Sequence, residues 1–267
     1  MRCISLGISV LVLLAASMAG IARGATIVPV TSGLHYRYAA DSITGLSHGS
    51  RVEIWPDDLS GQGRDVAQAD ETRRPFYITG GLNGLPVVRF TTANQFLHRP
   101  GDAFSSATLF VVGMADSRQT GVLLSEYSTD ASSGSNDRAW MLMARAGADG
   151  DPARDYNRWV ANAATGVQST LDGPDGGALG WNLLAASFSN AGSGYNEFFV
   201  NGTSIDSNTT SPRSNGNANL VIGAYQAAGT PPAVTFLRGD IAEIIAFDRV
   251  LSTVERRLVE NALSAKY

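Results

Sequence analysis

Cysteine is almost absent from this sequence, and its single copy, Cys3, lies close to the N-terminus. Residues 1–24 have the pattern of a secretory signal peptide: a basic Arg2, an apolar run and a small-x-small cleavage site that ends at Gly24. Cleavage there would leave a chain without disulfides, because no cysteine follows. We therefore expect a secreted or periplasmic protein that is stabilised by a large apolar core instead of cross-links.

Long apolar runs are also missing after the N-terminal one. That run is too short and too close to the chain end to favour a membrane-spanning helix. Cys3 precedes it, so no cysteine is placed for attachment of a lipid. No internal repeat and no long linker divides the remainder. The sequence predicts one domain over residues 25–267, with no membrane anchor.

Basic residues are too few for a nucleic-acid-binding surface. The sequence has 20 Lys and Arg against 24 Asp and Glu, a formal net charge of −4, and only 16% charged residues. A protein that neutralises phosphates needs a stripe of Lys and Arg, and none is present. We expect no nucleic-acid partner.

Histidine patterns for metal binding are scarce as well. The three histidines, His35, His48 and His98, form no close pair of the kind that holds zinc, and we expect structural or solvated roles for them. His48 lies in Gly45-Leu-Ser-His-Gly49, which matches the nucleophile elbow of α/β hydrolases. That motif needs a strand before it and a helix after it, and no α/β alternation exists here. We interpret it as a chance match in a loop.

Paired carboxylates at the spacing of a retaining glycosidase are absent too. Such enzymes need two acids about 5–5.5 Å apart, as alternate residues of one strand can supply. Glu243 and Asp248 differ by an odd number and would face opposite sides of a strand, and Glu197 is isolated. The pattern favours a non-catalytic protein over an enzyme. For Glu243 we expect a structural role, bonded to a loop amide or an Arg.

What the sequence does have is a regular alternation of short β-rich runs and turn residues. Gly, Ser, Thr, Asn and Asp interrupt the chain about every ten residues, which is typical of an all-β sandwich or barrel. Residues 107–114 form the most apolar run and predict a central strand. Residues 51–55 predict a strand with clean alternation. Asn83-Gly84 and Asn201-Gly202 predict tight hairpin turns, because both dipeptides tolerate positive φ.

The C-terminal segment carries the clearest local signals. Residues 241–247 are apolar on both faces, which predicts a strand buried on both sides. Ser252 with Glu255 three residues later forms a capping box, and apolar residues then recur at helical spacing toward Tyr267. The segment therefore predicts a final strand followed by a capped amphipathic helix.

Several motifs together resemble a known family. They are Val52-Glu-Ile-Trp-Pro-Asp-Asp-Leu-Ser-Gly-Gln-Gly63, Asn83-Gly-Leu-Pro-Val-Val-Arg-Phe90, Phe198-Phe-Val-Asn-Gly202, Val221-Ile-Gly223, Gly239-Asp-Ile-Ala-Glu-Ile-Ile245, Leu251-Ser252, Glu255-Arg256 and Lys266-Tyr267. In this order they resemble the concanavalin A-like, laminin-G-like jelly-roll domains of exported bacterial proteins. The resemblance covers residues 34–267. It departs in the extra Asp of the first motif and in Thr91-Thr92, where the family often has Asp-Gly.

This resemblance implies an all-β fold, a two-sheet antiparallel jelly-roll sandwich with a short C-terminal α-helix. It also implies carbohydrate binding on a concave face or at the loop rim. Some relatives bind calcium, and some are glycosidases or lyases. The fold alone leaves the function open.

Candidate site residues lie in the polar loops between residues 128 and 159. Asp155, Tyr156 and Trp159 combine acid and aromatic side chains, a mixture that suits a sugar site, although the pattern favours plain packing at a strand entry over that site. Asp149 and Asp151 are weak candidates for calcium ligands, with solvated loop acids as the alternative. Trp55, Trp140 and Trp181 are expected in the core. No other cofactor is indicated.

Three functions remain open. The first is an exported, non-catalytic module that binds glycans or another surface partner, with calcium as a candidate cofactor. The second is a glycoside hydrolase or polysaccharide lyase of the same fold. The third is a structural or adhesive extracellular domain, which would present a flat surface without a pocket.

Overall fold

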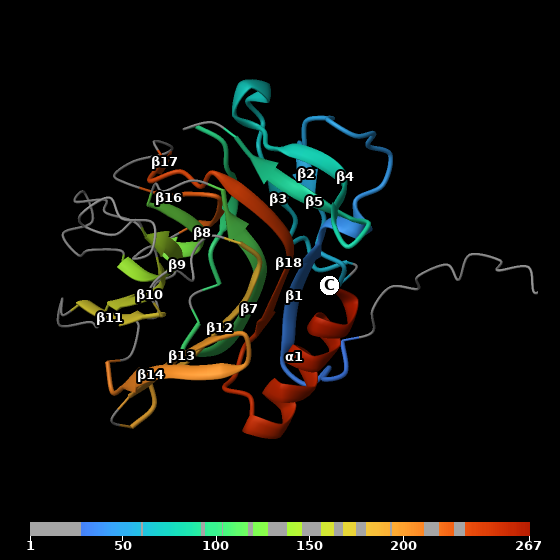
Figure 1. Cartoon of the computed structure of the whole chain (residues 1–267). Helices are drawn as coiled ribbons and strands as arrows, with labels where there is room; N and C mark the ends of the chain where they lie inside the picture. The colour runs from blue at the N-terminus through green and yellow to red at the C-terminus, as the bar shows by residue number, and fades with distance from the viewer. Residues whose placement is uncertain are drawn as a thin grey trace, which may run out of the picture.

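The computed structural model shows two antiparallel β-sheets packed face to face, with one helix on the outside (Figure 1). It describes residues 28–59, 61–91, 94–102, 104–116, 120–127, 138–145, 156–162, 168–174, 180–192, 194–210, 219–226 and 233–267. The predicted signal peptide, residues 1–24, lies outside this part of the chain. The all-β class, the two-sheet antiparallel sandwich and the C-terminal helix are confirmed.

The first sheet, sheet A, has eight strands. In spatial order they are β14 (Thr203–Asn208), β13 (Tyr195–Val200), β12 (Asn182–Ser189), β7 (Ser106–Ala115), β18 (Gly239–Phe247), β5 (Leu85–Phe90) and β4 (Phe76–Leu82), with β1 (Leu34–Ala39) also pairing with β18. The predicted central strand at residues 107–114 is confirmed, because β7 lies between β12 and β18 and is almost wholly buried.

The second sheet, sheet B, also has eight strands. They are β11 (Gln168–Asp172), β10 (Tyr156–Asn162), β9 (Arg138–Arg145), β8 (Gly121–Tyr127), β15 (Asn219–Ile222), β6 (Leu97–Pro100), β3 (Val66–Ala67) and β2 (Ile54–Trp55). A small hairpin of β16 (Tyr225–Gln226) and β17 (Ala233–Val234) and two 3₁₀ turns, η1 (Ala40–Ser42) and η2 (Glu71–Arg73), complete the description with α1 (Thr253–Lys266).

The strand predicted at residues 51–55 is shorter than expected. Only Ile54–Trp55 pairs as β2, and Arg51 makes a single isolated bridge to Phe76. Val52 donates its amide to the carbonyl of Pro75, 2.9 Å away. Because Pro75 has no N–H to return, the ladder cannot continue along this stretch. Arg51, Glu53 and Ile54 form part of the pocket described below, while Val52 between them is buried in the core.

The two sheets enclose an aromatic core. Trp140 stacks on Trp159 with ring centroids 5.7 Å apart, and Trp159 stacks on Phe188 at 5.9 Å. Trp55 and Phe90 lie in the same cluster, and all five side chains are at most 1% exposed. Such ring pairs contribute about 0.5–1.5 kcal/mol each beyond their burial. The core predictions for Trp55 and Trp140 are confirmed.

The C-terminal unit has the predicted form. All nine residues of β18 are buried, and α1 begins at Ser252 with a complete capping box to Glu255. α1 lies beside β1 in Figure 1, and its Val259 and Leu263 pack in one cluster with the outer face of sheet A. Within the described residues, no helix has the length and apolar character that crossing a membrane requires.

Glu243 of β18 ties this helix to the sheet. Its Oε1 accepts from Arg37 Nε at 2.6 Å, while its Oε2 accepts from Lys266 Nζ at 2.7 Å and from the Tyr267 hydroxyl at 2.9 Å. The carboxylate is 1% exposed, and both of its oxygens accept hydrogen bonds from these partners. The predicted structural role, with an Arg as partner, is confirmed.

The two Asn-Gly hairpins form where the sequence predicts them. Asn83 and Gly84 have φ of 47° and 80° between β4 and β5, and Asn201 and Gly202 have φ of 50° and 78° between β13 and β14. Positive φ at both central positions is the geometry of a type I′ turn, whose twist matches that of the strands.

Candidate functional site

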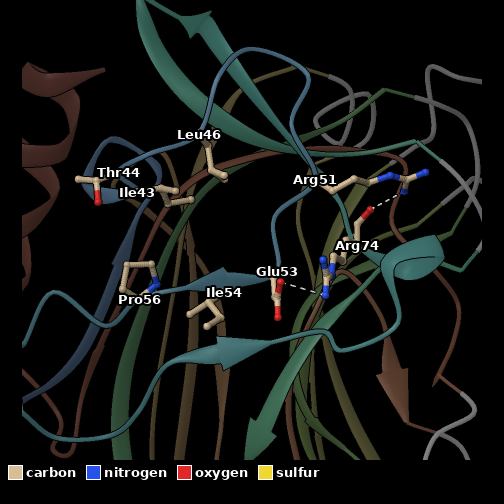
Figure 2. Close-up of a pocket in the computed structure, with 8 residues that line it drawn as sticks. All are labelled: Ile43, Thr44, Leu46, Arg51, Glu53, Ile54, Pro56 and Arg74. Atoms are coloured by element: carbon tan, nitrogen blue, oxygen red, sulfur yellow. Dashed lines mark hydrogen bonds and ion pairs between the residues drawn. The ribbon is translucent and has the colours of Figure 1, made fainter.

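A pocket of about 360 Å³ lies at one end of the sandwich, where the segment between η1 and β2 meets the start of β4 (Figure 2). Its lining residues are Ile43, Thr44, Leu46, Arg51, Glu53, Ile54, Pro56 and Arg74. We refer to it as the β2 pocket. In Figure 2 the aliphatic side chains gather on one side of the hollow and the charged ones on the other. The β2 pocket is therefore amphipathic.

The aliphatic side of the β2 pocket is exposed to an unusual degree. Ile54 is 48% exposed, one of three large apolar side chains with such exposure in the described chain. It belongs to β2, the edge strand of sheet B, while its neighbour Trp55 points into the core. Leu46 packs partly against the main core and also lines the pocket. An exposed aliphatic surface in a concave site is suited to packing against the C–H groups of a ligand.

Arg74 forms the rigid part of the charged side. Its Nε donates to the Gln68 carbonyl at 2.8 Å, and its Nη2 donates to the Ala69 carbonyl at 3.1 Å. Nη2 also lies 3.0 Å from Glu53 Oε2, whose side chain is 59% exposed. Because these bonds use most of its donors, Arg74 fixes the shape of the wall and orients Glu53.

Arg51 is different, because it has no carboxylate partner among the described residues. Its Nη1 donates to the Arg74 carbonyl at 2.8 Å, and its guanidinium carbon lies 4.4 Å above the centre of the Phe76 ring. These two contacts hold the planar group in place. A guanidinium has five N–H donors, so several remain available for a ligand. Arg51 is thus a positioned cation that no carboxylate of the described residues pairs with.

The wall beside these residues includes the Gly-x-Ser-x-Gly match. Gly45 and Gly49 take φ of 77° and 80° in an irregular loop, and His48 Nδ1 lies 3.0 Å from the Thr79 hydroxyl. No strand precedes the serine and no helix follows it, so the elements of a nucleophile elbow are missing at this position. The interpretation as a chance match is confirmed.

The described pockets do not contain the acid pair of a glycosidase. Glu53 is the single carboxylate of the β2 pocket. Two further cavities lie beside α1; one has Glu260 alone, and the other has no carboxylate. Double displacement needs two carboxyl groups about 5–5.5 Å apart, and inversion needs two at a wider separation. None of these three pockets presents the carboxylate pair that either mechanism requires.

A second cluster of ionisable groups is enclosed between the sheets. Glu126 of β8 is 1% exposed, and its Oε1 accepts from the Asp102 amide at 2.7 Å. Burial raises the pKa of Glu126 to about 8, with repulsion from Asp102 adding to the effect. Asp102 itself is paired with Arg99 at 2.6 Å and with His35 at 3.0 Å. The cluster is a closed structural network, and His35 has the structural role that we predicted.

The site residues predicted from the sequence are placed as follows. Asp149, Asp151 and Asp155 lie outside the described residues, and Tyr156 is described only by its backbone at the start of β10. Within the described chain no group of three or more His, Cys, Asp or Glu side chains could hold a metal ion. The calcium prediction therefore stays a prediction.

The expectation of a sugar-stacking role for Trp159 is corrected by its position. The side chain is 0% exposed, between Trp140 and Phe188, and its indole N–H donates to the Asn196 side chain. On β10 its alternation points it between the sheets, not toward solvent. The alternative interpretation, packing at a strand entry, describes it correctly.

The sequence pattern does not predict the β2 pocket. Its charged residues Arg51 and Glu53 were visible inside an apparent strand, where they predict an ordinary solvated face. The available signal was Pro56, which follows that strand, together with Pro75 opposite it, because prolines limit pairing to short edge strands. That Arg74 meets Arg51 could not be read from the sequence, since the contact depends on one isolated bridge.

Comparisons with known proteins yield matches of structure, while no family model and no curated protein matches the chain. A Trypanosoma rangeli sialidase in complex with sialic acid matches with a TM-score of 0.55, 13% identity, and coverage of 88% of this chain and 34% of the sialidase. The botulinum neurotoxin serotype D binding domain matches with 0.54, 9% identity, and coverage of 86% and 51%. The neurotoxin type G receptor-binding domain matches with 0.51, 11% identity, and coverage of 88% and 52%.

The chain thus spans between about a third and a half of these proteins' lengths. At such identities the likeness concerns the fold, not the chemistry of a site. Two eight-stranded antiparallel sheets, the strand order and these matches lead to one conclusion. The chain has the concanavalin A-like jelly-roll fold.

Proposed function

We propose that this protein is an exported, non-catalytic carbohydrate-binding module and that the β2 pocket binds an acidic sugar. The observation that carries the proposal is Arg51, a fixed guanidinium with unused donors and no described carboxylate partner, in the same pocket lining as the exposed Ile54. A planar guanidinium matches a carboxylate with two parallel hydrogen bonds. Export is part of the proposal and rests on the sequence of residues 1–24.

The shape and chemistry of the β2 pocket support a sugar rather than a simple anion. Its volume of about 360 Å³ is within the range of small-molecule sites, about 300–1,000 Å³. Ile54 and Leu46 offer an aliphatic surface for the C–H face of a pyranose ring. Thr44 and Glu53 offer a hydroxyl and a carboxylate that can bond to sugar hydroxyls. An inorganic anion would use only the cationic side.

The fold is compatible with this ligand class. The Trypanosoma rangeli sialidase that shares it was solved with sialic acid, which is an acidic sugar. At 13% identity this supports carbohydrate only as a class. Arg51 supplies the reason to prefer acidic members of that class.

Two other functions are less well supported. A hydrolase or lyase would need a pair of catalytic groups, and Glu53 has no second carboxylate in the β2 pocket. A purely structural or adhesive domain would need no concave site with a held cation. Calcium assistance through Asp149 and Asp151 remains a prediction, which titration with calcium and with a chelator can test directly.

Binding of acidic sugars provides the test. Isothermal titration with sialyllactose and with galacturonate and guluronate oligosaccharides should show binding, and neutral lactose should bind more weakly. In Arg51→Ala the affinity for the acidic ligand should fall by about tenfold or more, because the charge-assisted bonds are lost. Arg51→Lys keeps the positive charge but not the planar guanidinium with its paired donors, so we expect it to restore the affinity only in part.

Arg73→Ala is the matched control. Arg73 precedes Arg74 in the chain but does not line the β2 pocket, so its removal changes the net charge equally and should leave the affinity within about twofold. The proposal is contradicted if none of the acidic ligands binds, or if Arg51→Ala and Arg73→Ala weaken binding to the same extent. Unfolding temperatures of all variants should be compared first to confirm that each is folded.

A further inference from the structure

A second concave region lies where α1 rests on the outer face of sheet A. It consists of two cavities, of about 180 Å³ and 290 Å³, and both are lined by Leu183 of β12 and Ser264 of α1. Because they share these two residues, the cavities are adjacent, and we treat them together. We call this region the helix groove. None of its lining residues belongs to the β2 pocket.

An aromatic ring lines one end of the helix groove. Trp181 precedes β12 and has the same parity as Leu183, so its side chain points to the outer face of sheet A. It is only partly buried, whereas Trp55, Trp140 and Trp159 are at most 1% exposed. The core prediction for Trp181 is therefore met only in part. Trp181 is the tryptophan that a ligand can reach from solvent.

Polar side chains line the other end. Arg257, Asn261 and Ser264 of α1 are exposed and spaced at i, i+4 and i+7, so they share one face of the helix. Thr203, at the start of β14, faces them from the hairpin. Amides and hydroxyls of this kind both donate to and accept from sugar hydroxyls.

The charges around the helix groove favour a neutral ligand. The Trp181 end has no Asp, Glu, Lys, Arg or His among its lining residues. The Tyr267 hydroxyl, which could ionise, already donates to Glu243 at 2.9 Å. At the polar end Glu260 is paired with Arg256, which in turn lies 3.9 Å above the Phe199 ring, and the exposed Arg257 is the other charged residue of the lining. A charged group placed on Trp181 would lose water without gaining a counter-ion.

We propose that the helix groove is a second carbohydrate site and that it binds a neutral oligosaccharide. One sugar ring stacks its C–H face on Trp181, and the next extends toward Ser264, Asn261 and Thr203. The aromatic platform and the uncharged hydrogen-bonding groups of Asn261, Ser264 and Thr203 distinguish it from the β2 pocket, and Arg257 lies at the far end from Trp181. This proposal shares its ligand class with the proposed function but rests on different residues.

Intrinsic fluorescence and calorimetry test the proposal with four neutral probes: cellohexaose, xylohexaose, mannohexaose and laminarihexaose. At least one should shift the tryptophan emission of the wild type to shorter wavelength, since Trp181 is the partly exposed indole. Calorimetric affinity for that probe should fall by about tenfold or more in Trp181→Ala. Trp181→Tyr keeps an aromatic ring at this position, so it should retain most of the wild-type affinity for that probe.

Further variants keep the outcome decisive if Trp181→Ala is unstable. Asn261→Ala removes an exposed amide at the polar end and should weaken binding by several-fold. Leu258→Ala is the control: it lies on the same helix, is 47% exposed and lines neither cavity. The proposal is overturned if none of the four probes binds at millimolar concentration, or if Trp181→Ala and Leu258→Ala bind equally well. Loss of acidic-sugar binding in Arg51→Ala does not bear on this result, so the two proposals fail separately.

Discussion

At the scale of single residues, the described structure keeps most of its charged side chains in defined pairs. Glu243 is enclosed by Arg37, Lys266 and Tyr267, and Asp102 by Arg99 and His35. A buried charge without such partners would cost several kcal/mol. Against this background Arg51 stands out, since it is held by a carbonyl and a ring but not by a described carboxylate. This held guanidinium lines the pocket that we propose as the site.

Glu126 leads to a prediction about pH. Burial raises its pKa in the folded protein to about 8 from an ordinary value of 4.5. Between these values the unfolded chain loses a proton that the folded protein retains, so the free energy of unfolding should fall as pH rises through this window. Above about pH 8 the folded protein ionises too, and the decline should level off. Guanidinium unfolding at pH 5 and pH 8 measures the difference.

Glu126→Gln isolates this effect. Glutamine keeps an acceptor for the Asp102 amide but cannot ionise. The stability difference between wild type and variant should therefore shift in favour of the variant as pH rises from 5 to 8, by up to about 1.4 kcal/mol per pH unit. Parallel pH profiles for the two proteins would show that Glu126 is ionised in the folded state and would contradict the prediction.

At the scale of elements, some helices and turns are specified by neighbouring residues, whereas some strands are specified by the segments they pair with. α1 and the Asn-Gly hairpins follow from short-range rules, because capping and positive φ involve neighbouring residues. β14 was not predicted, since Thr203–Asn208 is a polar edge strand without apolar alternation. It forms because β13 offers a row of backbone groups to pair with. The shortened β2 has the opposite cause, a partner segment interrupted by Pro75.

The start of α1 gives a prediction at this scale. Ser252→Ala removes the hydroxyl that accepts from the Glu255 amide, and it should lower the free energy of unfolding by about 1 kcal/mol. Thr253→Ala, one residue later and with no cap bond, is the control and should cost less than half as much. Chemical denaturation of both variants provides the measurement. Equal losses would mean that the cap contributes little beyond the loss of a hydroxyl.

At the scale of the whole molecule, one apolar cluster runs between the sheets. It extends from Tyr38 and Trp55 near β2 to Trp159 and Phe188 near β10 and β12. Such a continuous core predicts that the sequence unfolds as one cooperative unit, in line with a single domain over residues 25–267. Thermal unfolding followed by tryptophan fluorescence and by far-ultraviolet circular dichroism should give coincident midpoints. Two separated transitions would show that the halves unfold independently.

The two proposed sites also differ in how they arise at this scale. The β2 pocket depends on an edge strand and on the bridge between Arg51 and Phe76. The helix groove depends on how α1 rests on sheet A beside Trp181. Neither requires strand pairing to change when a ligand binds, so both are prearranged by the fold. Prearranged sites lose little entropy on binding.

The sequence by itself determined the all-β class, the strand β18, the capping box at Ser252 and the structural role of Glu243. These depend on periodicity and on chemistry within a few residues, which the order of amino acids specifies directly. Only the tertiary structure decided that Trp159 is enclosed, that Trp181 is accessible and that Arg51 and Ile54 line one pocket. Those outcomes depend on which strands become neighbours and which edge remains unpaired, a choice made by packing of the whole chain.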